Sequence, residues 1–576
     1  MTLPQIEILA LLVLMLAAFA IGRFRFELVA LSGLAIGGLL GLVPPENLFL
    51  GFANPAVVTV LEILLIVQVL RRSRLIDVTA EMLDRSVRGN AQIVVALCLI
   101  GGILSVFMNN IGALALLLPL AMSACDRRGL PMRSLLMPLS FATLLGGMCS
   151  VVGTPANLMA DAAMAQYADH RLGFFELGQV GFPVALAGML YLVVMAFRAH
   201  PKPGDTERRV RHERRYAAEL AVTEGSVLAG RTLGEIEVEQ ELVVHNIVRN
   251  GRFVFGGDGR HAETGDILVL EGQEHVLNRL VEIGALVDGS GADDGGGMLE
   301  AVLLPESVFI GSCVGDLTAL TDLGIAIDRI GITARRVEGR LGDIRLAVGD
   351  VLVLRGERDA IAAECAETGL LLLRDRPEAI ASRPAYMPAI VFAIGIAASA
   401  VFGIDPAIAF GGVVLVLALC GQLALRQGLE TMNWPILVML GAIIPLGAAV
   451  GDTGAGAALA HGVAAFAPAT TPQALIVAML VLSVLLTPFI NNPSTVLVLA
   501  PVGSELARQF GLPPEPVIIA VTIGASLDFM TPFGHHNNTL VMGISGYSVA
   551  DFFRFGFPLV LLTTLVAALS ILVLIQ

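Results

Sequence analysis

Two short asparagine segments carry residues that could hold a small ion. Met108-Asn109-Asn110 and Ile490-Asn491-Asn492 each lie within a long apolar run, where free polar groups are tolerated only if they are buried in protein or line a cavity. Ser105 and Thr487 stand five residues before the last asparagine of each segment. Hydroxyl and amide oxygens are hard ligands of the kind that small cations prefer. The two segments therefore predict a pair of cation sites.

Two further segments interrupt apolar runs with glycine, proline and asparagine: Gly153-Thr154-Pro155-Ala156-Asn157 and Gly534-His535-His536-Asn537-Asn538. A helix that restarts inside a membrane presents unpaired amide hydrogens and the positive end of its dipole, which suits an anion. No Lys or Arg lies in these four segments. A divalent anion bound there would therefore rely on amides, helix dipoles and co-bound cations.

The four segments belong to an internal repeat. At an offset of 382 residues, seven of the 24 positions in 108–131 are identical to those in 490–513, including Pro119 with Pro501. With one residue deleted the two breaks also align, and Gly181-Phe182-Pro183 recurs as Gly556-Phe557-Pro558. Matched halves with broken helices and polar tips are typical of secondary transporters. The alternative is that the asparagines are hydrogen bonds between packed helices and the prolines are kinks.

The composition indicates which elements must position these residues. Of the 576 residues, 56% are hydrophobic and only 15% are charged, which excludes a soluble globular protein. The apolar runs are continuous and not alternating, which excludes a β-barrel. We expect an α-helical polytopic membrane protein. Its apolar runs lie near 6–22, 27–43, 55–70, 92–118, 134–165, 180–197, 388–403, 406–424, 434–451, 474–500, 515–545 and 558–575.

Arginine placement predicts the topology, because cytoplasmic loops are enriched in basic residues. Arg23 and Arg25 follow the first run, Arg127 and Arg128 follow the fourth, and Arg198 follows the sixth. These positions agree only if the fourth run is a re-entrant hairpin, which gives each half five crossings and inverts the second half. Both termini are expected outside a bacterial inner membrane. The expected repeats span 1–200 and 379–576, with hairpins near 92–118 and 474–500.

The tips and breaks resemble those of the divalent anion:sodium symporter (DASS) family of the ion transporter superfamily. The resemblance covers both membrane halves and implies an elevator-type homodimer, surrounded by membrane lipid, that carries a small anionic substrate with Na+. It implies one sodium ion near Ser105, Asn110 and the Gly153 carbonyl. A second ion is implied near Thr487, Asn492 and the Gly534 carbonyl. The implied substrate-binding residues are Asn109, Asn110, Thr154, Pro155, Asn157, Asn491, Asn492, Ser494, His535 and Asn538.

Departures from the family pattern bear on the substrate. Where the family has Ser-Asn-Thr, this chain has Asn109-Asn110-Ile111 and Asn491-Asn492-Pro493, and His535-His536 replaces a small hydroxyl and a proline. Sulfate or another small oxyanion fits such an amide-rich pocket as well as a dicarboxylate does. Asp528 and Glu62 are intramembrane carboxylates and therefore functional candidates. Asp528 is expected either to take part in coupling or to make a helix-end hydrogen bond.

An acidic segment separates the two halves and contains a repeat of its own. Residues 203–378 hold 32 Asp or Glu and 19 Arg, a net charge of −13, which argues against nucleic acid as a partner. The units resemble two RCK C-terminal (TrkA-C-like) domains, an α/β pair at 201–288 and 298–378 joined by a linker at 289–297. The resemblance implies a cytoplasmic module that dimerises or senses a small regulatory ligand. Its repeated residues are Ser226, Gly230, Gly234, Gly265, Asp266 and Gly272, which return as Ser307, Gly311, Gly315, Gly349, Asp350 and Gly356.

The functional prediction is a secondary transporter of a small divalent anion, with Na+ as the coupling ion. An enzyme is not expected, since the chain has no phosphate loop or dinucleotide fingerprint. A proton-coupled carrier or an anion exchanger on the same scaffold is the alternative. The RCK-like units alone would suggest a gated ion channel, but a Thr-Val-Gly-Tyr-Gly filter is absent from the sequence. The six scattered cysteines are expected to be small buried hydrophobes.

Overall fold

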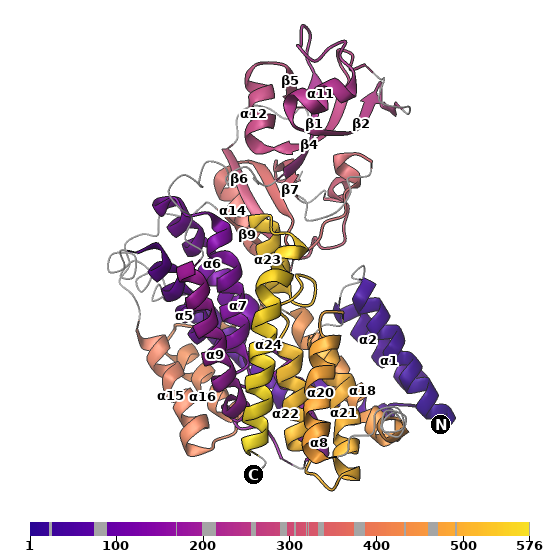
Figure 1. Cartoon of the computed structure of the whole chain (residues 1–576), viewed down its shortest axis with the longest axis vertical. Coiled ribbons are helices and arrows are strands. Elements are labelled where there is room, and N and C mark those ends of the chain that lie inside the picture. Colours follow the sequence, from indigo (N-terminus) through magenta and orange to yellow (C-terminus); the bar gives the residue numbers. More distant parts are fainter. Residues whose placement is uncertain are drawn as a thin grey trace.

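The computed structural model has a helical membrane part and a sheet domain that projects from one end of it (Figure 1). The sheet domain is built from the acidic central segment of the chain. The residues that the structure describes are 1–21, 26–73, 89–168, 170–198, 215–254, 261–288, 297–304, 307–317, 320, 322–331, 339–373, 386–430, 432, 434–458, 471–489 and 492–574.

The membrane part follows the order of the apolar runs. The helices of the first half are α1 (Leu3–Ile21), α2 (Phe26–Leu39), α3 (Pro55–Arg72), α5 (Asn90–Phe107), α6 (Asn110–Arg128), α7 (Leu136–Gly147), α8 (Pro155–Tyr167) and α9 (Gly178–Arg198). Those of the second half are α15 (Met387–Phe402), α16 (Pro406–Leu419), α17 (Leu425–Glu430), α18 (Trp434–Asp452), α20 (Pro472–Leu486), α21 (Asn492–Gln509), α22 (Glu515–Ser526), α23 (His536–Ser545) and α24 (Val549–Leu574).

The outer helices expose apolar side chains. In α9, Leu186 and Leu190 are 74% and 64% exposed, and in α24 the side chains of Leu561, Leu565 and Leu569 form an exposed row four residues apart. Such a row faces a hydrocarbon environment at no cost, whereas water would disfavour it. Among the described residues, five helices are long and apolar enough to cross a membrane. The chain is therefore an integral membrane protein.

Both asparagine tips interrupt a pair of contacting helices. α5 ends at Phe107 and α6 begins at Asn110, while α20 ends at Leu486 and α21 begins at Asn492. The second pair of breaks also lies where the glycines and prolines predict it. α7 ends at Gly147 before α8 starts at Pro155, and α22 ends at Ser526 before α23 starts at His536.

Two expectations need correction. The last apolar run was expected from 558, but α24 begins at Val549 because Ser548 and Asp551 cap it: each backbone N–H donates to the side chain of the other, at 2.8 and 3.3 Å. The cysteines are not all buried, since Cys313 is partly exposed and Cys420 is exposed. The polar first turn of α24 explains why the helix starts before the apolar run. Cys313 and Cys420 lie next to the ends of helices and not within them, which explains their exposure.

The central segment folds into one continuous sheet. The strands are β1 (Arg215–Val222), β2 (Val243–Arg249), β3 (Arg252–Phe253), β4 (Ile267–Gln273), β5 (Leu286–Asp288), β6 (Gly297–Leu303), β7 (Ala326–Gly331), β8 (Val351–Gly356) and β9 (Leu370–Leu372). Their order in the sheet is β3-β2-β4-β1-β7-β8-β6-β9, with β5 also paired to β1. The two sequence units meet where β1 pairs antiparallel with β7, with Ala217 opposite Ile330. The helices are α11 (Leu233–Gln240), α12 (Glu274–Glu282) and α14 (Arg358–Thr368).

The repeated residues of this segment make the same hydrogen bonds in both units. Ser226 Oγ donates to the carbonyl of Ala285 at 2.7 Å, and Ser307 Oγ donates to that of Thr368 at 2.8 Å. The side chains of Asp266 and Asp350 each accept from a backbone N–H three residues earlier at 2.8 Å. The internal repeat that the sequence indicates is thus also a structural repeat.

The sheet domain touches the membrane part at α23. Gly349 has a φ of +86°, and a Cβ added to it would lie 2.8 Å from the carbonyl oxygen of Thr539. The equivalent glycine of the first unit, Gly265, has a φ of +85° and open space around it. A glycine is therefore needed at 349 both for its backbone conformation and for close approach to α23.

Candidate functional site

The first tip gathers oxygen atoms from three segments. The hydroxyl of Ser105, fully buried near the end of α5, lies 2.7 Å from the Asn110 side-chain amide. Gly147 leaves room for this amide, since a Cβ there would lie 1.9 Å from its inner atom. When the amide is turned to satisfy its neighbours, its nitrogen donates to the carbonyls of Thr143 at 3.1 Å and Gly153 at 3.0 Å. Ser105, Asn110 and Gly153 therefore meet at one point.

His535 fixes the orientation of this amide. His535 caps α23 by accepting the N–H of Asn537 on its Nδ1 at 3.1 Å, so a neutral imidazole carries its proton on Nε2. Nε2 lies 3.4 Å from the outer atom of the Asn110 amide. That atom must then be the oxygen, which agrees with the orientation in which the amide nitrogen faces the two carbonyls. The second break thus contacts the tip of the first half.

The second tip has the same core arrangement. Thr487, fully buried at the end of α20, lies with its hydroxyl 3.0 Å from Asn492 Oδ1 and 2.8 Å from the carbonyl of Ala525. Asn492 and Ser494 are buried in the first turn of α21. Asn491, which the sequence assigns to the substrate, lies outside the described residues. Its counterpart Asn109 is partly buried and caps α6 by accepting the N–H of Gly112 at 2.7 Å.

A buried asparagine bridges each helix break. Asn157 Nδ2 donates to the carbonyls of Gly147 and Ser150 at 2.8 and 2.7 Å. Asn538 Nδ2 donates to those of Asp528 and Thr531 at 2.9 and 3.2 Å. The acceptors lie ten and seven residues before the asparagine in both halves. These asparagines therefore hold the carbonyls that the breaks leave without helical partners.

The other predicted residues of the breaks have capping positions. Thr154 is 1% exposed and caps α8 by accepting from the N–H of Ala156 at 3.0 Å. Pro155 is the first, partly buried residue of α8, where its missing N–H costs nothing. His536 is the first residue of α23. The N-termini of α8 and α23 thus have matched caps at equivalent positions, Thr154 and His535.

Asn537 is a site residue that the sequence reasoning missed. Its Nδ2 donates to the backbone carbonyl of Asn110 at 3.0 Å and lies 2.9 Å from the hydroxyl of Thr143. Its Oδ1 has no hydrogen-bond partner among the described residues. Ser140 Oγ also crosses between the halves, donating to Asn538 Oδ1 at 2.8 Å. The signal in the sequence was that the second break has two asparagines, Asn537 and Asn538, whereas the first has only Asn157. Asn537 aligns with Ala156 in the repeat and was therefore not identified as a site residue.

Asp528 lies beside the second break. It is 1% exposed, and a Cβ on Gly534 would lie 2.0 Å from its Oδ2. Thr531 Oγ1 is 3.5 Å from Oδ1, and Oδ2 has no hydrogen-bond partner among the described residues. Glu62 is buried in α3 against Gly411 of α16, away from the tips and breaks. No group of three or more His, Cys, Asp or Glu that could hold a metal occurs in the described chain, so a cation here would depend on neutral oxygens and this one carboxylate.

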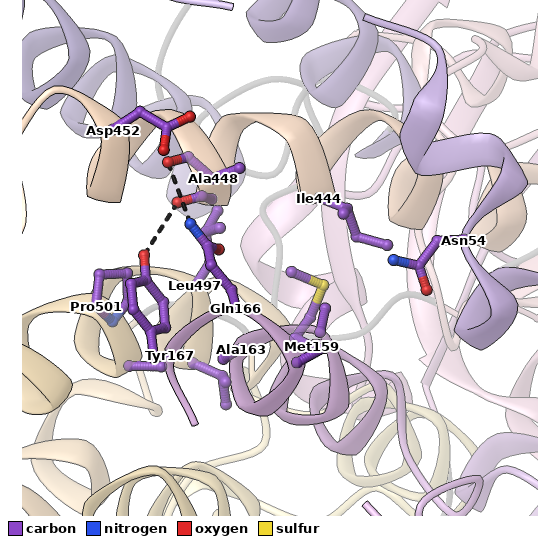
Figure 2. Close-up of a pocket in the computed structure, with 15 residues that line it drawn as sticks. Asn54, Met159, Ala163, Gln166, Tyr167, Ile444, Ala448, Asp452, Leu497 and Pro501 are labelled. Carbon is purple, nitrogen blue, oxygen red and sulfur yellow. Dashed lines mark hydrogen bonds between the residues drawn. The ribbon is translucent and has the colours of Figure 1, made fainter. Parts of the chain in front are cut away.

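A cavity of about 380 Å³ separates α8 and α21 from α18. Gln166 and Tyr167 of α8 line it (Figure 2) and donate to the carbonyls of Ala448 and Gly447, at 3.3 and 3.4 Å. A Cβ on Gly451 would lie 2.9 Å from the Tyr167 hydroxyl. The contact between α8 and α18 therefore includes two long hydrogen bonds beside a partly empty space.

Two contacts at equivalent repeat positions tie the halves together. Arg133 pairs with Asp551 at 3.5 Å, and the aligned positions carry Glu515 and His170, which lie 3.9 Å apart and form an ion pair when His170 is protonated. Arg133 also donates to the carbonyl of Ser545 at 3.2 Å, at the end of α23. The basic Arg133 of the first half thus corresponds to the acidic Glu515 of the second half, and each contacts a residue of the opposite half.

Comparison with known proteins places the chain in a family. The chain is 28% identical to an uncharacterized transporter, sll0640, of Synechocystis sp., over 98% of this chain and 96% of that one. It is 27% identical to the uncharacterized transporter YfbS of Escherichia coli over 98% of both chains. It is also 28% identical to sodium/sulfate cotransporter 2 of Chlamydomonas reinhardtii, over 44% of this chain and 32% of the relative.

A solved structure, the YdaH transporter of Alcanivorax borkumensis, aligns over 99% of this chain and 98% of its own with 16% identity and a TM-score of 0.45. The model of the citrate transporter family (CitMHS) matches residues 15–472 and 467–576. The resemblance seen in the sequence is therefore confirmed at the level of the ion transporter superfamily. The chain belongs to the citrate transporter family.

Proposed function

We propose that the chain is a sodium-coupled secondary transporter of a small divalent anion. The observation that carries the proposal is the matched pair of tips, in which a buried hydroxyl meets an asparagine amide five residues later in each half. Hydroxyl, amide and carbonyl oxygens at membrane depth suit a small hard cation. Membership of a transporter family and similarity to sodium/sulfate cotransporters support the same assignment.

The two membrane halves are proposed to be inverted repeats of five crossings and one hairpin each. The equivalent bridges made by Asn157 and Asn538 support the repeat. In both halves the acceptor carbonyls lie ten and seven residues before the asparagine, and chance would rarely produce the same two spacings. The contacts of Arg133 and Glu515 with the opposite half support it independently. With an odd number of crossings in each half, the sheet domain lies on the opposite side of the membrane from both termini. An N-terminus outside the cell would thus put both termini outside and the sheet domain in the cytoplasm.

The substrate is proposed to bind between the tips and the N-termini of α8 and α23. Helix N-termini attract anions, and no Lys or Arg of these segments competes for that role. We place Asn109, Thr154 and His535 nearest the anion because they cap the helices whose N–H groups would face it. Sulfate is the preferred candidate and a citrate-like or other carboxylate the second.

The transport motion is proposed to be of the elevator type. α8 and α21 would move together past α18, and the long hydrogen bonds from Gln166 and Tyr167 beside the cavity are contacts that can break at low cost. A homodimer would supply the fixed scaffold. The sheet domain, as a regulatory or dimerisation module, is positioned to bias the motion through the contact of Gly349 with α23.

Uptake into proteoliposomes tests the proposal. Radiolabelled sulfate, succinate and citrate are offered with an inward sodium gradient, with a proton gradient, or with neither. We expect sodium-dependent uptake of one of these anions, and a loss to near background for Asn110→Ala and Asn492→Ala. Gln422→Ala, on an exposed loop, is the control variant. Uptake that follows protons and ignores sodium would instead support the proton-coupled carrier, with Asp528 as the proton site.

The role of the sheet domain has a separate test. A chain in which 216–373 is replaced by a flexible linker should keep some sodium-dependent uptake at an altered rate, since the proposed ligands all lie in the membrane halves. A folded, dimeric form of this variant that binds no substrate would show instead that the sheet domain belongs to the binding machinery.

A further inference from the structure

We propose that the two tips are not equivalent: the second binds a cation with Asp528 as its charged ligand, and the first is closed by the chain's own amides. The proposal rests on the function proposed above and refines it. In the absence of substrate, each chain would bind one sodium ion, and not the two that a symmetric repeat suggests.

Two exchanges between the halves distinguish the tips. Gly147 in the first half corresponds to Asp528 in the second, since Asn157 and Asn538 donate to their carbonyls, so only the second half carries a carboxylate at this position. Ala156 corresponds to Asn537, so only the second half sends an amide across to the opposite tip. Both sequence differences favour cation binding at the second tip over the first. One adds a carboxyl group to the second half, and the other adds hydrogen-bond donors to the first tip.

At the first tip, amide donors occupy the oxygens that would bind a cation. Asn110 Nδ2, in the orientation fixed by His535, donates to the carbonyls of Thr143 and Gly153. Asn537 Nδ2 adds a donor to the Asn110 carbonyl. An N–H group and a cation cannot share one lone-pair direction, so a sodium ion would have to displace these bonds.

At the second tip, the described residues offer these acceptors fewer donors. Asn492 Oδ1 and the carbonyl of Ala525 face the single hydroxyl of Thr487, which can donate to only one of them. Asp528 Oδ2, on a side chain 1% exposed, has no hydrogen-bond partner among the described residues and lies against the backbone of Gly534. A buried carboxylate with an open oxygen is costly unless an opposite charge accompanies it.

The segment 471–548, which contains the second tip and the second break, supplies one basic residue, and that residue is paired elsewhere. Arg508 is the only Lys or Arg between 471 and 548, and it lies near Glu505, with 3.9 Å between their charged atoms. A monovalent cation at the second tip would neutralise Asp528 and complete an oxygen ligand set with Thr487 and Asn492. The same ion at the first tip would meet neutral groups already bonded to one another.

Equilibrium binding of radioactive sodium to the purified full-length protein, without any anionic substrate, tests the proposal. We expect one ion per chain in the wild type. Asp528→Asn should lower the affinity by roughly 100-fold, as expected for removal of one member of a buried charge pair. Gln422→Ala, on an exposed loop that contributes none of the proposed ligands, should keep the wild-type affinity within about 3-fold.

A second variant guards against misfolding of Asp528→Asn. Ala156→Asn removes no ligand but gives the second tip the amide that the first tip receives from Asn537, and it should abolish sodium binding in a protein that remains monodisperse. Two ions per chain, or sodium binding that survives Asp528→Asn, would overturn the proposal while leaving sodium-coupled uptake intact. Absence of sodium binding in the wild type overturns it too, and the uptake assay then shows separately whether sodium coupling itself fails.

Discussion

Both the membrane part and the sheet domain are built from internal duplications, but the copies have diverged differently. In the sheet domain Ser226 and Ser307 make the same hydrogen bond in each unit. In the membrane part the bridging asparagines Asn157 and Asn538 are equally matched, yet the residues around the tips differ. Bonds that hold the backbone are kept in both duplications, so differences at the tips mark positions where the two copies have separate tasks.

The exchanged charges sharpen this comparison. Arg133 and its repeat partner Glu515 have opposite signs, but each pairs with a residue of the other half. A structural contact tolerates such an exchange because only the product of the two charges matters. Asp528 and Gly147 do not fit this pattern, since Oδ2 of Asp528 has no hydrogen-bond partner among the described residues. A buried carboxyl oxygen without a partner is better explained by a ligand than by packing.

The largest effect is expected from the bridging asparagines. Asn157→Ala and Asn538→Ala each leave two buried carbonyls without donors, so each should lower the stability of the folded protein by roughly 3 kcal/mol. Thermal unfolding of the purified variants, followed by size-exclusion chromatography, measures the loss. Similar losses in both variants are expected because both make the same bridge. A loss confined to one variant would mean that the two breaks are held in different ways.

A second contrast lies between the hydroxyls of the tips. Thr487→Ala should raise the sodium concentration for half-maximal uptake by roughly 10-fold, about the worth of one charge-assisted contact. Ser105→Ala should raise it much less, because the first tip is closed by amides. Uptake at saturating substrate over a series of sodium concentrations gives both values. Equal shifts in the two variants would argue for two equivalent cation sites.

The contact between the sheet domain and α23 allows a matched pair of variants. Gly349→Ala and Gly265→Ala place a side chain on nearly the same positive φ, at a cost of about 1–2 kcal/mol each. Only Gly349→Ala also presses on the carbonyl of Thr539. We therefore expect the uptake rate to change in Gly349→Ala and to stay near wild type in Gly265→Ala, with similar expression of both. A similar rate change in both variants would show that backbone strain in the sheet domain suffices.

The sequence predicted most of what positions the site. Apolar runs indicated the helices, and Gly153-Thr154-Pro155 indicated the first break, because proline and glycine interrupt helices through local backbone chemistry. Ser105 and Asn110 could be paired from spacing alone, since both lie next to the same turn. Local features of this kind are visible in one stretch of sequence.

Contacts between distant segments could not be predicted in the same way. The reach of Asn537 to Asn110, more than 400 residues earlier in the chain, depends on how the halves pack. The joining of β1 to β7 into one sheet depends on which edges the two units leave open. Gly349 was noted as part of a repeat, but its approach to α23 follows from the position of the whole domain.

The smallest effect is expected at a pair of β-bulges in the sheet domain. In the first unit His245, at the bulge of β2, lies 2.8 Å from Glu271 of β4, and in the second Asp328, at the bulge of β7, pairs with Arg355 of β8. The hydrogen bond from His245 lowers the pKa of Glu271 below its usual value of 4.5. A carboxyl with a lowered pKa in the folded state stabilises that state above pH 4.5, and the contribution is lost as the pH falls through the folded-state pKa.

Hydrogen exchange of the full chain between pH 6 and pH 3.5 measures this contribution. Amides of β2 and β4 should lose protection as the pH falls, by less than about 1 kcal/mol because the pair is partly exposed to solvent. In Glu271→Gln the protection of these strands should no longer follow the titration of this carboxyl. If the pH response of β2 and β4 is unchanged in Glu271→Gln, the contact between His245 and Glu271 does not stabilise the first unit. The bulge of β2 is then held by packing alone.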